Sequence, residues 1–184
     1  MNIYNLDIKV DSPFGNLYRK RLALIAVQDS EGNILVGSKP NFYPKGIYRM
    51  VGGGVDENED HIVGAQRELK EELGINVELS DLKLLLQVNV HAVDKEGKEY
   101  NNSNFIYFYQ LKHNNYKAGD DIKSIIKLSV DELYKLGEEY ESLNENDWFK
   151  SEMENYNWKD YGKVYGPIHK LTASILFKVD NILS

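Results

Sequence analysis

The stretch between positions 53 and 75 constrains this 184-residue chain more than any other feature. It reads GGVDENEDHIVGAQRELKEELGI and follows the pattern G-x5-E-x7-R-E-U-x-E-E-x-G-U, where U is a bulky aliphatic residue. Because each residue type makes up roughly 7% of a typical protein, such a pattern arises by chance on the order of 10⁻⁹ times per starting position. The spacing therefore points to a constraint on structure and chemistry.

The second half of this stretch predicts a helix over about residues 60–73, with Gly74 as its C-terminal cap. Residues three and four apart share a helix face, so the carboxylates of Glu71 and Glu72 each project within about 60° of that of Glu68. The apolar residues form a neighbouring face that would anchor the helix to a sheet: Ile62, Ala65, Leu69 and Leu73.

Three crowded carboxylates repel one another, which raises the pKa of at least one of them unless a cation is present. Mg²⁺ prefers carboxylate oxygens, waters and phosphate oxygens as ligands, and it can polarise a phosphoryl oxygen. Gly52, Gly53 and Gly54 would let the backbone approach such an ion closely and expose a carbonyl oxygen to it. The pattern thus predicts a divalent metal site.

The pattern closely resembles the signature of the Nudix hydrolases, which cleave diphosphate linkages in nucleotides and related compounds with a divalent metal. The resemblance implies that Mg²⁺ (or Mn²⁺) is held by the three glutamates and by the carbonyl of Gly52. It also implies that Glu59 and Arg67 pair across the loop and the helix and brace the site. Three positions depart from the usual family pattern, and none of them removes a ligand: Val51, Asn58 and Gly64.

Elsewhere the chain alternates strand and helix signals. Strands are expected at 22–27, 34–36, 82–93 and 105–111, with a short extended stretch at 47–50. A capping box at 129–132 opens a helix through about 136, one more helix is expected within 138–161, and Pro167 would begin a last one. We therefore predict an α/β fold, a Nudix-like α/β/α sandwich with a mixed sheet and additional C-terminal helices. One domain would span 1–184, with a core at about 16–137 and a helical extension at about 138–184.

Composition excludes several functional classes. The formal net charge of −7 argues against a nucleic-acid polymer as partner, although Arg19, Lys20 and Arg21 form one basic cluster. The longest apolar run is six residues, at 22–27, which is too short to cross a membrane. The chain has no cysteine, and its first ten residues lack the pattern of a secretory signal, so a cytoplasmic protein is expected.

The predicted function is Mg²⁺-dependent hydrolysis of the diphosphate linkage in a nucleoside diphosphate derivative. Water would attack phosphorus, and Glu68, Glu71 and Glu72 would be the catalytic residues. Nucleoside triphosphates and nucleotide sugars both remain open as substrates. The alternative is a catalytically silent Nudix-fold module that binds nucleotides. A third option, isopentenyl diphosphate isomerase, relies on a cysteine that this chain lacks.

Further side chains are candidates for substrate binding. Tyr48, Tyr107 and Tyr109 are expected either to stack on a base or simply to pack, and Asp120 or Asp121 either joins the site or is a surface acid. The histidines show no metal-ligand spacing and receive no role. The general base, the number of metals, a homodimer and the role of residues 138–184 are left open.

Overall fold

The structure is a computed structural model of residues 1–184 and describes all of them except 1, 40–43, 45, 120–121, 151–154 and 184. The described helices are α1 (Gly15–Tyr18), α2 (His61–Leu73), the 3₁₀ turn η1 (Leu79–Asp81), α3 (Val130–Glu141) and α4 (Trp158–Leu183). The described strands are β1 (Asn2–Lys9), β2 (Arg21–Gln28), β3 (Ile34–Ser38), β4 (Arg49–Gly54), β5 (Lys83–Val93), β6 (Glu99–Gln110), β7 (Ser124–Leu128), β8 (Trp148–Lys150) and β9 (Asn155–Asn157).

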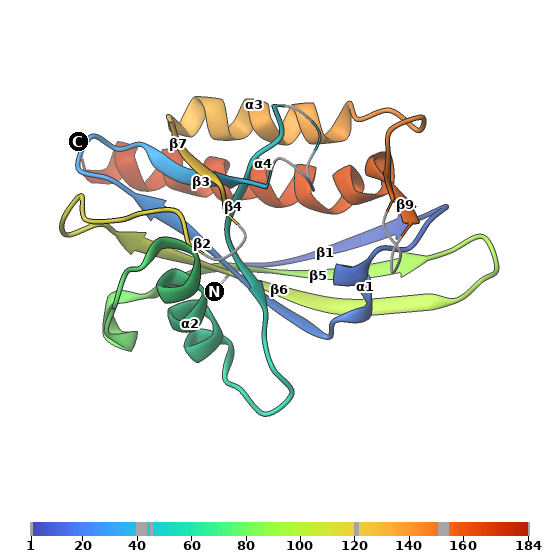
Figure 1. Ribbon diagram of the computed structural model, residues 1–184, viewed down its shortest axis with the longest axis horizontal. Helices are drawn as coiled ribbons and strands as arrows, with labels where there is room; N and C mark the ends of the chain where they lie inside the picture. The colour runs from blue at the N-terminus through green and yellow to red at the C-terminus, as the bar shows by residue number, and fades with distance from the viewer. Residues whose placement is uncertain (1, 40–43, 45, 120–121, 151–154, 184) are drawn as a thin grey trace.

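Within the described residues, seven strands form one mixed sheet in the order β1-β5-β6-β2-β4-β3-β7. The β1–β5 and β2–β6 pairs are parallel, and the other neighbours are antiparallel. Helix α2 lies against one face of the sheet, while α3 and α4 lie over the other (Figure 1). This confirms the predicted mixed-sheet sandwich with C-terminal helices.

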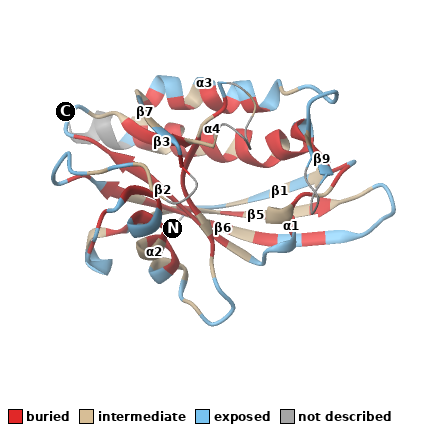
Figure 2. Ribbon diagram, viewed as in Figure 1, coloured by how far each residue is buried: buried red, intermediate tan, exposed pale blue. Residues whose placement is uncertain are grey.

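Strand β2 shows why the sheet needs cover on both sides. Seven of its eight residues are buried, because its side chains alternate between two apolar cores. Ala23, Ile25 and Val27 point into the core beneath α2, whereas Leu24 and Ala26 point into the core beneath α3 and α4. Figure 2 shows buried residues concentrated at the centre of the sheet and along α4. Because β2 is buried on both faces, its pairing with β4 fixes the position of β4 between the two cores.

Helix α2 begins and ends where its sequence signals predict. The Asp60 side chain accepts a hydrogen bond from the N–H of Ile62 at 3.1 Å, which caps the first turn. Gly74 ends the helix with a φ of +67°, a conformation that glycine adopts without steric cost. Leu69 and Leu73 are fully buried against the sheet, and the neighbouring residues Glu68 and Glu72 lie against β4.

The structure adds an N-terminal strand that the sequence pattern did not predict. Asn2–Lys9 forms β1, which pairs in parallel with β5 although it lies outside the predicted core of 16–137. Its apolar residues Tyr4, Leu6 and Ile8 pack towards the α4 side. Asparagine and aspartate at the intervening positions are poor strand formers, so pairing with β5 decides the conformation. The boundaries of the core and of the domain stay a prediction.

The C-terminal third also differs from expectation. The prediction that Pro167 begins the last helix is wrong, because α4 begins at Trp158 and contains Pro167 in its interior. Of the stretch 138–161, the described part holds the end of α3, the strands β8 and β9 and the start of α4 in place of a separate helix. Aromatic side chains explain the early start, since Trp158, Tyr161 and Tyr165 bury their rings in the core. None of the described helices is long and apolar enough to cross a membrane.

Candidate active site

Strand β4 ends in three glycines that lie directly against α2. Gly52 has a φ of +133°, and a Cβ there would lie 2.1 Å from the carbonyl oxygen of Ala23. A Cβ on Gly53 would lie 2.6 Å from Oε1 of Glu68. Any larger residue would collide with the sheet or with this carboxylate. The glycines therefore allow a helix carboxylate to reach the backbone of β4.

Two of the three predicted catalytic glutamates are buried at this contact. Glu68 is 8% exposed and Glu72 is 3% exposed. The N–H of Gly52 donates to Oε2 of Glu72 at 2.8 Å, and Nζ of Lys39 lies 3.5 Å from Oε1 of the same carboxylate. Burial raises the pKa of Glu68; the charge of Glu72 adds to this effect, and Arg67 opposes it. Negative charge is therefore concentrated beside the glycines.

Arg67 joins the loop, the helix and the carboxylates. Its Nε and Nη2 atoms each lie 3.1 Å from one oxygen of Glu59, and Nη2 also donates to the carbonyl of Gly54 at 2.7 Å. Its Nη1 donates to Glu68 at 2.8 Å and to Glu71 at 3.0 Å. The hydrogen bond from Arg67 lowers the pKa of Glu59, and the Glu59 carboxylate raises the pKa of Arg67. One guanidinium thus fixes the 54–59 loop to α2.

The donor set suits a hard divalent cation. It contains the carboxylates of Glu68, Glu71 and Glu72 and the carbonyl oxygen of Gly52. The N–H of Gly52 bonds Glu72, and its carbonyl accepts a hydrogen bond from Nη2 of Arg49. Among the described residues, no three histidine or acidic side chains already converge on one metal position. Arginine and lysine groups now neutralise these oxygens, so a metal ion would share or replace those contacts.

Comparisons with known proteins identify the family of this chain. A family model described as the NUDIX domain matches residues 18–150. The chain belongs to the Nudix family. No curated protein sequence matches it significantly.

Solved Nudix structures share the fold at low sequence identity. The Escherichia coli dihydroneopterin triphosphate pyrophosphohydrolase is 19% identical, with a TM-score of 0.52 over 69% of this chain and 88% of its own. A Caenorhabditis elegans Ap4A hydrolase is 16% identical, with a TM-score of 0.50 over 89% of this chain and 97% of its own. A MutT/nudix family protein from Enterococcus faecalis is 20% identical, with a TM-score of 0.48 over 59% of this chain. This chain spans 43% of that last protein.

Of the three tyrosines expected either to stack on a base or to pack, two have buried rings. Tyr107 and Tyr109 are 2% and 3% exposed, and they pack beneath the Nudix helix α2. The Tyr107 hydroxyl contacts Nδ1 of His61, whose ring stacks on Phe105 with centroids 3.8 Å apart. We therefore leave these two rings out of the proposed site. Tyr48 is half-buried against the core beneath α3 and α4.

Other contacts at the site were not predicted from the sequence. Asp120 and Asp121 lie outside the described residues, so their role stays a prediction. Arg49, Lys39 and His169 were given no role, yet the first two contact the predicted ligands and the third contacts β4. An arginine next to a buried strand is one signal for such a role, because a buried cation requires partners. Lys39 and His169 carry no such local signal.

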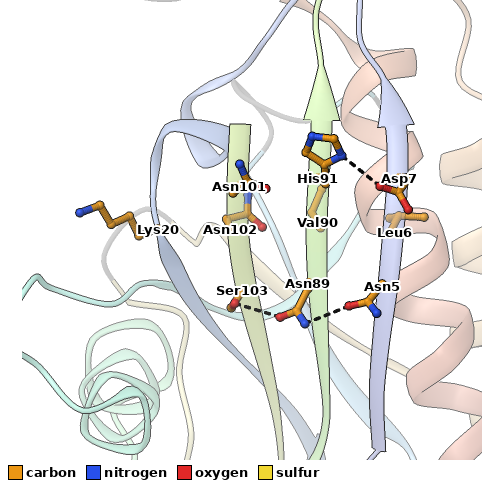
Figure 3. A pocket seen from close by; sticks show the side chains of 10 residues that line it. All are labelled: Asn5, Leu6, Asp7, Lys20, Asn89, Val90, His91, Asn101, Asn102 and Ser103. Atoms are coloured by element: carbon orange, nitrogen blue, oxygen red, sulfur yellow. Dashed lines mark hydrogen bonds and ion pairs between the residues drawn. The ribbon is translucent and has the colours of Figure 1, made fainter. Parts of the chain in front are cut away.

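A hollow of about 440 Å³ lies over the strands β1, β5 and β6 (Figure 3). It is lined mostly by polar side chains, and none of the predicted Nudix residues is among them. Asn89 bonds Asn5 at 3.0 Å and Ser103 at 3.0 Å, and His91 lies 3.0 Å from Asp7. These polar groups satisfy one another across the strands, which is a structural role.

Proposed function

We propose that this protein is a Nudix-type pyrophosphohydrolase that cleaves the diphosphate linkage of a nucleoside diphosphate derivative by attack of water at phosphorus. One observation carries the proposal. Two buried glutamates of α2, Glu68 and Glu72, meet the glycine backbone of β4, and Arg67 braces both elements. A solvated acidic helix face would have neither the burial nor this backbone contact.

The proposed cofactor is Mg²⁺ or Mn²⁺, held by Glu68, Glu71, Glu72 and the carbonyl of Gly52. When bound, it supplies positive charge that neutralises the diphosphate and activates water. The protein's own groups prepare the ligands. The N–H of Gly52 orients Glu72 through its 2.8 Å hydrogen bond, and Arg67 holds Glu68 and Glu71 on one side of the helix. Positioning and charge neutralisation account for most catalysis of phosphoryl transfer.

The proposed substrate is a small nucleotide, either a nucleoside triphosphate or a nucleotide sugar. The net charge of −7 disfavours binding of a nucleic-acid polymer. It does not hinder binding of a small polyanion whose phosphate charge is neutralised by metal ions. Two solved relatives, named for dihydroneopterin triphosphate and for Ap4A, act on phosphoanhydrides. They support this class of bond and not a particular substrate.

A substrate panel tests the proposal. The purified protein is incubated with nucleoside triphosphates, nucleotide sugars and dinucleoside polyphosphates, each with and without Mg²⁺ or Mn²⁺, and products are separated by chromatography. We expect metal-dependent cleavage of at least one class and a loss of at least about 100-fold in Glu72→Gln. Glu138→Gln is the matched control, because Glu138 is an exposed glutamate on α3. Full activity in Glu72→Gln would contradict the assigned site.

The silent binding module remains the second candidate, and one observation favours it. Arg49 occupies the carbonyl of Gly52, and Lys39 lies against Glu72, so cationic side chains stand where the metal would bind. Such a protein would bind nucleotides without a metal. Calorimetry with a nucleotide in EDTA separates the two, since metal-free binding together with no product after long incubation would support the module over the enzyme.

A further inference from the structure

The segment that leads into the three glycines of β4 contacts the C-terminal helices at three consecutive residues. Each of the positions 48, 49 and 50 has a hydrogen bond to a side chain of α3 or α4. The Tyr140 hydroxyl donates to the carbonyl of Tyr48 at 2.8 Å, Nη1 of Arg49 donates to the Tyr161 hydroxyl at 3.3 Å, and the N–H of Met50 donates to Nε2 of His169 at 3.3 Å. The C-terminal helices thus hold the start of β4, next to the glycines.

Arg49 extends this contact to the predicted metal ligand. Its side chain is buried, and its guanidinium carbon lies 5.6 Å from the centre of the Tyr165 ring. Nη2 donates to the carbonyl oxygen of Gly52, while Nη1 donates to Tyr161. Tyr161 is therefore two hydrogen bonds away from the Gly52 carbonyl.

Gly52 needs such external contacts because glycine has the freest backbone. Its φ of +133° lies outside the range that other residues prefer. Glycine also has no side chain that could restrict the direction of its peptide groups. The N–H is fixed by Glu72 on the α2 side, and the carbonyl is fixed by Arg49 on the α4 side. Both contacts add to the pairing of β4 with β2, which places Gly52 opposite Leu24, and loss of the Arg49 contact would loosen the carbonyl.

His169 supports the same strand in its neutral form. Burial lowers the pKa of His169 to about 4, so the ring is uncharged at neutral pH. Nδ1 lies 2.6 Å from the carbonyl of Tyr165 and therefore carries the hydrogen, which leaves Nε2 to accept from Met50. Both ring nitrogens are used in holding backbone, so His169 acts as a structural support.

We propose that Tyr161 is a positioning residue for the metal site: through Arg49, it fixes the direction of the Gly52 carbonyl. This inference rests on the proposed function, because it assumes that this carbonyl binds the metal through its second lone pair while Arg49 keeps the first. It assigns a task to the C-terminal segment, which completes the site from the side opposite α2.

The first test is metal binding by Tyr161→Phe. This substitution keeps the ring, whose centroid lies 5.0 Å from that of Phe14 and 4.4 Å from that of Tyr165, and removes only the hydroxyl. Calorimetry should show a Kd for Mn²⁺ that is about threefold to tenfold higher, the effect of one lost hydrogen bond. Tyr100→Phe is the matched control, since buried Tyr100 donates to Asp94 at 2.9 Å near the β5–β6 hairpin. It should bind Mn²⁺ as the wild type does.

The second test separates positioning from stability. At limiting Mn²⁺ the Tyr161→Phe enzyme should lose activity that returns at saturating Mn²⁺, with the KM for substrate unchanged. Hydrogen exchange should speed up at the amides of residues 50–54 in Tyr161→Phe but not in Tyr100→Phe. Unchanged Mn²⁺ affinity together with unchanged exchange would overturn the proposal. If the wild type itself binds no Mn²⁺, the proposed function fails, while exchange still decides whether Tyr161 positions the loop.

Discussion

Arg67 and Glu59 form a bidentate ion pair that joins the 54–59 loop to α2. Nε and Nη2 of the arginine each lie 3.1 Å from a different oxygen of the same carboxylate. Side by side, these two hydrogen bonds fix the plane of the guanidinium, which then directs Nη1 at Glu68. The pair therefore links the shape of the loop to the orientation of a proposed metal ligand.

Arg67→Lys should lower both activity and stability. A lysine ammonium cannot bond Glu59, Gly54 and Glu68 at once with the geometry of a planar guanidinium. We expect kcat/KM to fall about 100-fold and the free energy of unfolding to fall by roughly 1–3 kcal/mol. Glu59→Gln and the double variant complete a cycle measured by kinetics and urea unfolding. Additive losses would show that the two residues act independently.

Gly53→Ala should weaken metal binding. The new Cβ would lie 2.6 Å from Oε1 of Glu68 and force this carboxylate away from β4. We expect activity at a fixed Mn²⁺ concentration to fall at least about tenfold, the effect of displacing one ligand. Gly97→Ala controls for backbone strain, because Gly97 has a φ of +83° and open space around its Cβ position. Equal activities in the two variants would contradict the prediction.

His169 should make stability fall as the pH falls from about 6.5 to about 4. The ring is buried, and its pKa is lowered from 6.5 to about 4. Between these two pH values His169 is protonated in the unfolded chain but neutral in the folded chain. Stability is therefore full above pH 6.5, and the loss reaches roughly 3 kcal/mol near pH 4. Urea unfolding at several pH values measures the slope. His169→Gln lacks the titrating group and should show a smaller slope, whereas parallel curves would refute the prediction.

Asp160→Asn should destabilise the fold and leave kcat unchanged. The buried carboxylate accepts from the N–H groups of Asp11 and Ser12 at 2.8 Å each and pairs with Lys163 at 2.7 Å. These contacts join the segment after β1 to the first turn of α4. We expect a loss of roughly 2–4 kcal/mol in urea unfolding. At a temperature where the variant is fully folded, its kcat should match the wild type, and a large drop in kcat there would count against this account.

Local spacing in the sequence was enough to predict the helix at 61–73, its glycine cap and the shared face of Glu68, Glu71 and Glu72. These features depend on residues within one or two helical turns of each other, and the 3.6-residue repeat determines their directions. The same pattern placed the chain in the Nudix family and so predicted the mixed sheet between helices. Patterning of polar and apolar residues also indicated the buried central strand β2.

Tertiary structure alone decided how the site is supported. The contacts of residues 48–50 with Tyr140, Tyr161 and His169 join residues 92 to 119 positions apart, and no local pattern in the sequence indicates such pairs. The strand β1 and the early start of α4 likewise depend on partners that pack against them from distant parts of the chain. Local propensity sets which side chains share a face, whereas packing sets which faces meet.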